Sequence, residues 1–395
     1  MFAARWTTAT SDAVNQILAV AGVPGIISFA GGLPDPATFP TAALPALVAL
    51  VLADGASDAL QYAPTPGLVS TRRFVADRLE RLEEARPDDG ELMITSGAME
   101  GIELIGLSLV DPGDPVVVEG PSYVGALLAL QSVEARLVPV PLDDDGLDTE
   151  RLAARLHSGA RPKVVYTIPD FHNPAGVSLS AERRRHLLEL ADRYGFLIVE
   201  DVAYRELWFE RPPDRSLWAT RPDLVLQLGT FSKVFFPGVR LGWAAGPAPL
   251  IERMVGAKQT TDQCAGAFGQ RLLEAYGRGG GLDEQLGRSR TFYRQRRDGL
   301  LALLAEESSD VASWTRPGGG FYTWLTVAGD VDTTALARSA LDRHVAFVPG
   351  AVFYPDGRGG RSLRLSYSRI TDDELETGVE RLDQVIRSAL GREDR

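Results

Sequence analysis

The sequence predicts an α/β protein in which a large, doubly wound, mostly parallel sheet lies beside a smaller α/β unit. Two observations lead to this fold class. Between residues 92 and 243, short β-branched runs alternate with helix-length segments, as in a parallel sheet whose strands are joined by helices. From residue 277 the pattern changes to a Gly-rich turn and a long Arg- and Leu-rich stretch, which indicates a helix leaving the first unit.

Four strands of the large sheet are the clearest, and they span residues 115–120, 163–169, 195–201 and 224–230. Between the second and third strands, Ser180 is a candidate N-cap and Gly195 a candidate residue just past a helix end. Apolar residues recur at helical spacing between them. We therefore expect a helix there that crosses between two parallel strands.

The chain divides into three parts on this pattern. Residues 1–50 are expected to form an N-terminal arm and part of the small domain, and residues 51–283 the large, ligand-binding domain. Residues 284–395 are expected to form the interdomain helix and the rest of the small domain.

Composition excludes several classes of protein. The 395 residues carry a formal net charge of −12, which repels nucleic acid and anionic membranes. A single cysteine, Cys264, excludes an internal disulfide framework. Met1 to Arg5 lack the apolar core of a signal peptide and no apolar run is long enough to span a bilayer, so we expect a soluble cytoplasmic protein. The four histidines show no metal-ligand spacing, so no metal site is predicted.

Unusual polar groups follow the predicted strands, at the sheet edge where doubly wound proteins bind ligands. Each has an ordinary explanation when taken alone: a helix start, a packed turn aromatic, an Asn-Pro turn, an N-cap aspartate and a surface lysine. In chain order they are Gly97, Ala98 and Met99 at a helix N-terminus, Tyr123, Asn173, Asp201 with Tyr204, and Thr230, Ser232, Lys233 and Arg240.

Their order is more informative than any single residue. Free amides at a helix N-terminus bind phosphate, and Thr230, Ser232 and Arg240 are donors suited to the same dianion. Lys233 lies among apolar residues that would lower its pKa, so it can form a Schiff base with a carbonyl. A phosphate anchor, an aromatic platform, a buried aspartate and such a lysine are what pyridoxal phosphate requires.

On these motifs the chain resembles the class I/II aminotransferases, pyridoxal phosphate enzymes of fold type I, and within them the 2-aminoadipate and kynurenine branch. The resemblance covers nearly the whole length. The stretches that carry it are ISFAGGLPDPATFP, LQYAPTPGL, ITSGAMEG, GPSYVGA, IPDFHNPAG, VEDVAYREL, GTFSKVFFPGVRLGW, RPGGGFYTWL, VAFVPGAVFYPDG and LRLSYS.

The resemblance implies catalytic and cofactor-binding roles. Lys233 would hold the cofactor as an internal aldimine and move the substrate proton, and Asp201 would pair with the pyridine nitrogen. Asn173 and Tyr204 would hydrogen-bond the ring oxygen, and Tyr123 would stack on the ring. The residues implied to bind the phosphate are Gly97, Ala98, Met99, Thr230, Ser232 and Arg240, with Tyr62 reaching across a homodimer interface.

The resemblance also implies a substrate site for an amino acid and a 2-oxo acid, used in turn in a ping-pong reaction. Arg364 would clamp the α-carboxylate, helped by Asn173 and the Gly32 backbone. Without the family, Arg364 would be an ordinary strand arginine. The expected walls of the side-chain pocket, which suggest an apolar or aromatic substrate, are Tyr62, Phe321, Phe353 and Tyr354.

The sequence departs from the branch in several positions. Ala98 and Met99 replace a Ser and a Gln, so side-chain phosphate contacts are lost. Asp170 and His172 replace a Ser and a Gln beside the site, which suggests a different pocket. The N-terminal arm has no arginine in the register that contacts a dicarboxylate side chain, since Arg5 lies too early.

Two other functions stay open on the sequence. The same cofactor supports a lyase or cyclase acting on an amino acid in a specialised biosynthetic pathway. Aminotransferase-like modules also serve as sensing parts of transcription regulators, but here the pattern begins by Ile26 and the chain is acidic, which disfavours DNA binding.

Overall fold

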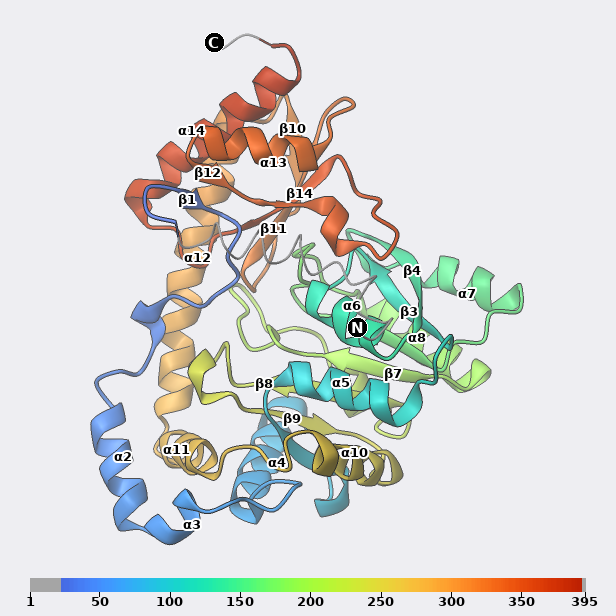
Figure 1. The fold of residues 1–395 in the computed structure, drawn as a ribbon, viewed down its shortest axis with the longest axis vertical. Helices are drawn as coiled ribbons and strands as arrows, with labels where there is room; N and C mark the ends of the chain where they lie inside the picture. Colours follow the sequence, from blue (N-terminus) through green and yellow to red (C-terminus); the bar gives the residue numbers. More distant parts are fainter. Residues whose placement is uncertain (1–22, 393–395) are drawn as a thin grey trace, which may run out of the picture.

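The structure, a computed structural model, describes residues 23–392. A larger unit and a smaller unit are joined by the long helix α12 (Gly281–Glu307), which runs along both (Figure 1). This helix lies within the Arg- and Leu-rich stretch where the sequence predicts it. The predicted contribution of the N-terminal arm around Arg5 lies outside the described residues.

The larger unit contains a mixed, mostly parallel sheet, as predicted. Within residues 23–392 its eight strands follow the order β2-β9-β8-β7-β6-β3-β4-β5. Strands β9 and β5 run antiparallel to their neighbours, and the other strands run parallel. The strands are β2 (Leu92–Thr95), β3 (Pro115–Gly120), β4 (Arg136–Asp143), β5 (Gly146–Leu147), β6 (Val164–Thr167), β7 (Leu197–Asp201), β8 (Val225–Thr230) and β9 (Gly242–Ala245).

Helices cover both faces of this sheet, so its central strands are apolar on both sides. In β3, Val116 and Val118 belong to one buried core and Val117 to the other. One face packs against α5 (Ala98–Leu109), α6 (Val124–Ser132) and α10 (Ala248–Thr261). The other packs against α4 (Val69–Glu83), α7 (Thr149–His157), α8 (Ala181–Tyr194), α9 (Leu217–Thr220) and α11 (Ala267–Arg278).

Helix α8 shows how local sequence sets an element's ends. The Ser180 side chain accepts a hydrogen bond from the Arg183 N–H, which satisfies one free donor of the first turn. Gly195 ends the helix in a left-handed conformation with φ 71°. The predicted helix between β6 and β7 is therefore confirmed, together with both of its boundaries.

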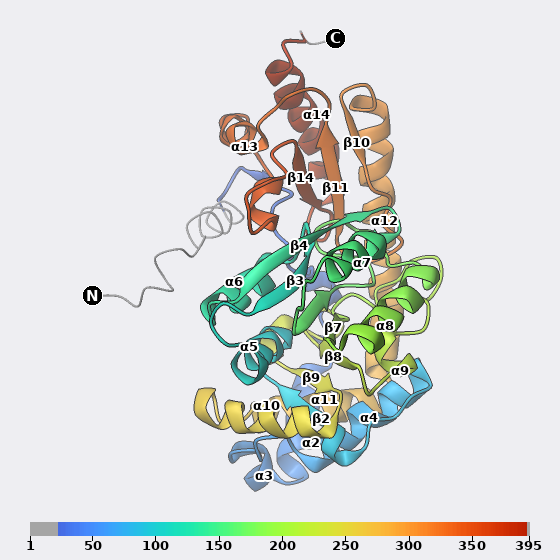
Figure 2. The same ribbon diagram turned by 90° about the vertical axis from the view of Figure 1, so that its right-hand side faces the viewer.

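The smaller unit is built on a four-stranded antiparallel sheet in the order β10-β11-β14-β13 (Figure 2). Its strands are β10 (Ala312–Trp314), β11 (Tyr322–Val327), β13 (Val348–Pro349) and β14 (Ser362–Ser366), and its helices are α13 (Thr333–Asp342) and α14 (Asp372–Ala389). The early strand β1 (Ile27–Ser28) pairs with β12 (Val345–Ala346), so the start of the described chain joins this unit.

Helix α2 (Leu44–Ala53) lies elsewhere. It packs on α11 of the larger unit, and α3 (Ala56–Leu60) follows it there (Figure 1). The boundary that we predicted at residue 50 falls inside α2, because the apolar periodicity that marks a helix does not show which unit the helix packs against.

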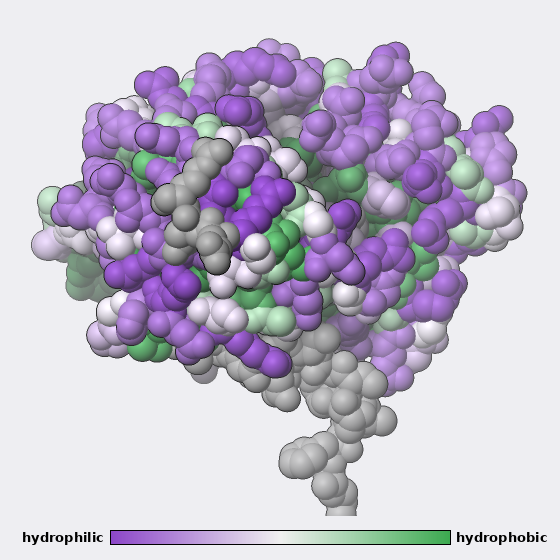
Figure 3. Space-filling model, turned by 90° about the horizontal axis from the view of Figure 1, so that it is seen from above, coloured by the Kyte–Doolittle hydropathy of each residue, from purple (hydrophilic) through white to green (hydrophobic). Residues whose placement is uncertain are grey.

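Short 3-10 turns complete the described chain, and they are η2 (Pro36–Thr38), η3 (Asp89–Glu91), η4 (Pro237–Val239) and η5 (Gly350–Phe353). The end of the molecule that carries α13 and α14 has a mainly hydrophilic surface with smaller hydrophobic patches (Figure 3). None of the helices in residues 23–392 is long and apolar enough to cross a membrane.

Candidate active site

The structure places the predicted polar residues at one edge of the large sheet. Strands β2, β3, β6, β7 and β8 run in the same direction, so their carboxyl ends share this edge. The order of strands reverses between β3 and β6, which opens a crevice of the kind that binds ligands in doubly wound folds. The residues that follow these strands are Gly97, Tyr123, Asn173, Asp201 and Lys233.

Lys233 follows β8 and is only partly buried. Its Nζ donates a hydrogen bond to the Gly32 carbonyl at 3.2 Å, and the rings of Phe321 and Tyr204 lie 5.6 and 5.9 Å away. Burial lowers its pKa to about 8, and the nearby Arg364 and Arg240 charges act in the same direction. The amine can therefore lose its proton near neutral pH and become a nucleophile.

Asp201 ends β7 and is 3% exposed. The Tyr166 hydroxyl donates to its Oδ2 at 2.8 Å, and the Ala203 N–H donates to its Oδ1 at 3.1 Å. Burial raises the pKa of this carboxyl, and these two donors only partly offset the effect. Within residues 23–392 the side chain has no cationic partner, and a bound N–H cation would stabilise its ionised form.

Sequence reasoning missed Tyr166. It lies in β6 within an otherwise apolar run and is 1% exposed. A tyrosine buried in a central strand normally has a partner for its hydroxyl, and that rule was the available signal.

Thr230, Ser232 and Arg240 gather beside the start of α5. The Thr230 and Ser232 hydroxyls are 3.0 Å apart, and Arg240 Nη1 donates to Ser232 Oγ at 3.2 Å. Gly97 has φ +96°, and a Cβ there would lie 2.7 Å from Arg240 Nη2. The positive φ favours glycine at this position, and a side chain there would also displace the end of Arg240.

The N–H groups of Ala98 and Met99 are available to an anion here, because the first turn of an α-helix leaves its amides without intrahelical partners. Together with the two hydroxyls and the guanidinium, these amides form a donor set that fits a phosphate group.

We call this donor set, made by Thr230, Ser232, Arg240 and the first amides of α5, the phosphate cradle. A cluster of three charged side chains lies next to it. The Lys258 Nζ, in a side chain that is 0% exposed, donates to both carboxylate oxygens of Glu100 at 2.6 and 2.7 Å. It also donates to Asp262 at 2.7 and 2.9 Å. Ser96 joins the cluster to the cradle: its N–H donates to Glu100 at 2.6 Å, and its carbonyl accepts from Arg240 Nη2 at 3.1 Å.

Arg364 projects from β14 toward the loop after β6. Its Nη1 donates to Asn173 Oδ1 at 3.0 Å and its Nη2 to the Ala30 carbonyl at 2.7 Å. Its Nε is buried without a hydrogen-bond partner. The sequence predicts that the Gly32 backbone helps Arg364 to bind the substrate α-carboxylate, which stays a prediction; the Gly32 carbonyl itself accepts a hydrogen bond from Lys233 Nζ.

The predicted aromatic residues of the site differ in their surroundings. The Phe353 ring centre lies 5.0 Å from the Arg364 guanidinium carbon, and Tyr354 follows it in the chain. Burial raises the pKa of Tyr123 to about 12 and that of Tyr204 well above its ordinary value, so both hydroxyls stay protonated at neutral pH. Tyr62 is 76% exposed in the single chain.

Two of the residues that depart from the family's pattern, Asp170 and His172, are buried and have polar partners. Asp170 accepts hydrogen bonds from Arg184 and Arg205, and Arg205 also pairs with Glu83 through two contacts. His172 Nε2 lies 2.9 Å from a Glu119 carboxylate oxygen. Asp170 is thus held in a buried ion pair and His172 in a buried contact with a carboxylate, and our interpretation of both as signs of a different substrate pocket stays a prediction.

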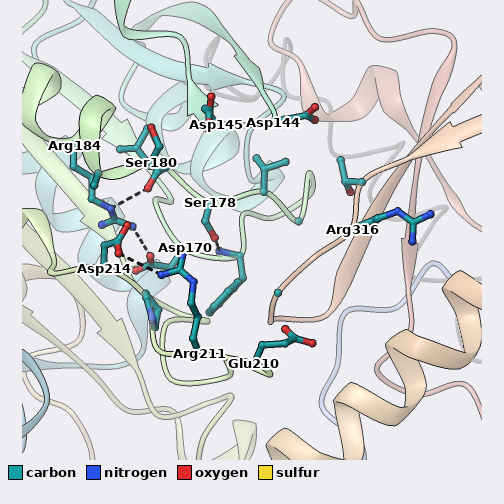
Figure 4. Close-up of a pocket in the computed structure, with 18 of the residues that line it drawn as sticks. Asp144, Asp145, Asp170, Ser178, Ser180, Arg184, Glu210, Arg211, Asp214 and Arg316 are labelled. Atoms are coloured by element: carbon teal, nitrogen blue, oxygen red, sulfur yellow. Dashed lines mark hydrogen bonds and ion pairs between the residues drawn. The ribbon is translucent and has the colours of Figure 1, made fainter.

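Asp170 and Arg184 also line a cavity of 780 Å³ beside the loop that follows β6 (Figure 4). The cavity is bordered by residues 144–145, 176–181, 210–214 and 314–316, and the predicted site residues do not line it. This cavity is therefore separate from the group of residues around Lys233.

The charges at the strand ends fit pyridoxal phosphate. Asp201 needs a cationic N–H, the cradle needs an anion, and Lys233 is an amine with a lowered pKa beside both. Within residues 23–392 no group of His, Cys, Asp or Glu could hold a metal ion.

Comparisons with known proteins agree with this site. The sequence profile of the family described as aminotransferase class I and II matches residues 26–382. Aromatic-amino-acid aminotransferase 1 of Thermococcus litoralis is 36% identical over 95% of this chain and 92% of its own length. The 2-aminoadipate transaminase of Thermus thermophilus is 35% identical over 96% of this chain and 95% of its own.

A solved structure gives the same result. The kynurenine aminotransferase of Pyrococcus horikoshii, crystallised with pyridoxamine phosphate and kynurenine, superposes with a TM-score of 0.95 at 36% identity. The match covers 99% of this chain and 98% of that one.

Proposed function

The chain belongs to the class I and II aminotransferases and is an aminotransferase, and from this premise we propose that it carries pyridoxal 5′-phosphate on Lys233. The observation that carries this proposal concerns two side chains at one sheet edge: among residues 23–392, Lys233 makes no contact with a carboxylate and the buried Asp201 makes none with a cation. A cofactor with an aldehyde, a ring nitrogen and a phosphate meets both needs at once.

When bound, this cofactor supplies an electron sink for the pair of electrons left on the substrate Cα after its proton is removed. Asp201 would keep the ring nitrogen protonated, because the cationic N–H would stabilise a carboxylate whose burial is only partly offset by its two hydrogen-bond donors. Thr230, Ser232 and Arg240 hold the phosphate together with the amides of Gly97, Ala98 and Met99. Tyr123 packs against the ring, and Asn173 and Tyr204 hydrogen-bond its oxygen.

Lys233 also moves the proton. Its pKa of about 8 lets it accept a proton from the substrate Cα and return it to a neighbouring carbon at neutral pH. Gly32 fixes the position of its Nζ through the 3.2 Å hydrogen bond. The same side chain therefore holds the cofactor and serves as general base.

Arg364 binds the α-carboxylate that both substrates share. Asn173 and the Ala30 carbonyl orient its guanidinium, and its buried Nε remains as an unpaired donor. One clamp for an amino acid and a 2-oxo acid supports a two-stage reaction, in which the first product leaves before the second substrate binds.

A lyase or cyclase reaction was left open by the sequence. The relatives give this alternative no support, since they are aminotransferases by name. Apolar and aromatic walls at Phe321, Phe353 and Tyr354 favour an amino acid with an apolar or aromatic side chain.

We further propose that the enzyme is a homodimer in which Tyr62 reaches the phosphate of the partner's site. A tyrosine that is 76% exposed in one chain, next to the exposed Leu60, is suited to an interface. Helix α2 points the same way, because it is apolar throughout and only Val51 is buried.

The half-reaction tests the main proposal. Purified protein with added cofactor is mixed with single amino acids in the absence of any oxo acid. We expect its visible absorption band to bleach, with release of one 2-oxo acid for each site that bleaches. The Lys233→Ala variant should show no such band. Lys163→Ala is the matched control, because Lys163 is a surface lysine paired with Asp114. Release of another product without bleaching would favour a lyase, and a wild-type protein without any band would refute the cofactor assignment.

Mixed dimers test the role of Tyr62. If Tyr62 acts across the interface, combining Tyr62→Ala with Lys233→Ala chains yields one site in which both residues are intact. Tight cofactor binding should then return in the mixture. If the mixtures exchange subunits but cofactor binding stays weak, Tyr62 acts in the site of its own chain or in neither site.

A further inference from the structure

Tyr322 is a further phenol at the site that sequence reasoning did not single out. It is the first residue of β11, directly after the RPGGGF turn, and it is 3% exposed. Its hydroxyl lies 3.2 Å from the Tyr204 hydroxyl. The two rings meet edge to face, with centres 5.7 Å apart and an interplanar angle of 81°.

The same side chain touches the carboxylate side of the site. The Arg364 guanidinium carbon lies 4.3 Å from the centre of the Tyr322 ring, which is cation–π distance. The Tyr322 hydroxyl also fills the space above Gly32, where a Cβ would lie 1.9 Å from its oxygen. Any larger residue at Gly32 would therefore displace the phenol.

We propose that Tyr322 is a positioning residue that links the two halves of the site: its hydroxyl orients the Tyr204 hydroxyl, and its ring seats the Arg364 guanidinium. This inference rests on the proposed function. It assigns Tyr322 no direct contact with the reacting atoms.

The direction of the hydrogen bond follows from proton counting. Each neutral phenol has one hydroxyl proton and can therefore donate one hydrogen bond. If Tyr204 gives its proton to the ring oxygen of the cofactor, the remaining bond runs from Tyr322 to Tyr204. A donor bonded to Tyr204 makes Tyr204 a stronger donor in turn, because hydrogen bonds in a chain polarise one another.

This coupling has a spectroscopic consequence. A stronger hydrogen bond from Tyr204 stabilises negative charge on the ring oxygen, and that charge otherwise favours protonation of the nearby lysine-linked nitrogen. Removal of the Tyr322 hydroxyl should therefore raise the pH at which the visible band of the loaded enzyme titrates. A group that only fills space would leave this midpoint unchanged.

The test uses two substitutions in the holoenzyme. Tyr322→Phe keeps the ring and removes the hydroxyl, so we expect the midpoint of the visible band to rise by a few tenths of a pH unit while KM for the amino acid changes little. Tyr322→Leu removes the ring as well, so KM should rise by about 2- to 10-fold, in line with the strength of a cation–π contact. Tyr194→Phe is the control, because Tyr194 lies at the end of α8 beside His157.

The outcomes separate this inference from the proposed function. A wild-type band that titrates normally and a superimposable curve for Tyr322→Phe would overturn the role of the hydroxyl. An unchanged KM in Tyr322→Leu would overturn the role of the ring. A wild-type protein without any visible band would instead refute the proposed function itself.

Discussion

Two lysines in this chain lie beside the same cofactor cradle in opposite electrostatic settings. Lys258 is 0% exposed and makes four hydrogen bonds of 2.6 to 2.9 Å to Glu100 and Asp262. Lys233 opens onto the site, and its hydrogen bond is to a backbone carbonyl at 3.2 Å. The carboxylates of Glu100 and Asp262 balance the positive charge of Lys258, whereas the amine of Lys233 is available to react with a ligand.

The contrast extends to the carboxylates. Asp170 accepts hydrogen bonds from two arginines. Burial alone would raise the pKa of this carboxyl, but the two positive charges outweigh that effect and lower it. Asp201 receives only a phenol and an amide, and burial raises its pKa. Buried charges that are paired stabilise a structure only when both partners stay in place, while unpaired ones mark functional sites. The predictions below test this division.

Replacing the unpaired lysine should have the largest effect. Lys233→Ala is expected to lower kcat by about 10⁴-fold, because it removes both the attachment point and the general base. The melting temperature of the cofactor-free protein should stay equal or rise, because the charged form of Lys233 is disfavoured by its surroundings. Half-reaction rates and thermal unfolding of the apoprotein measure the two effects, and a strongly destabilised apoprotein would contradict the account.

Replacing the paired lysine should invert this pattern. Lys258→Met leaves two carboxylates without their cation, so we expect a loss of about 3–5 kcal/mol in unfolding free energy. At saturating cofactor, kcat should stay within a few-fold of wild type. Denaturant unfolding gives the stability, and a variant that folds normally but is inactive would show that Lys258 is part of the chemistry.

Asp201→Asn should reduce activity less than loss of Lys233. The amide cannot neutralise a ring N–H cation, so kcat is expected to fall by about 10²-fold. The apoprotein should unfold at the same or a higher temperature, since an uncompensated carboxyl is removed. An Asp114→Asn variant, altered at a surface ion pair with Lys163, is the control. Equal activity in both variants would refute the role of Asp201.

The smallest effect is a pH dependence in the apoprotein. The pKa of Lys233 falls from 10.5 to about 8 on folding, so the unfolded chain binds more protons between these values. The resulting destabilisation is complete below pH 8 and disappears as the pH rises toward 10.5. We expect wild type to gain stability relative to Lys233→Met across this window. A difference between the two proteins that does not change with pH would contradict the lowered pKa.

Strand ends and site positions were predictable because they depend on local pattern. The apolar runs of β3, β6, β7 and β8 predicted the sheet, and the polar residues that follow them lie at one sheet edge, where their roles in a site stay predictions. The ends of α8 were predictable because Ser180 and Gly195 flank the helix and cap it through local backbone contacts.

Contacts between distant segments were not predictable from the sequence. Tyr166 reaches Asp201 from a neighbouring strand, and Tyr322 meets Tyr204 across 118 positions in the chain. The ion pair of Asp170 with Arg205 and that of Lys258 with Glu100 likewise depend on tertiary packing, which leaves no periodic trace in the sequence. For the same reason, the sequence did not show that α2 packs on α11.

Identification of the lysine that holds the cofactor tests the central claim most directly. The chain contains three lysines, Lys163, Lys233 and Lys258, so the experiment has few possible outcomes. The holoenzyme is reduced with borohydride, digested, and its peptides are examined by mass spectrometry. We predict that the cofactor mass appears on the peptide that contains Lys233 and on neither of the others. Labelling of Lys258, or no labelled lysine in a protein that shows the visible band, would contradict the account.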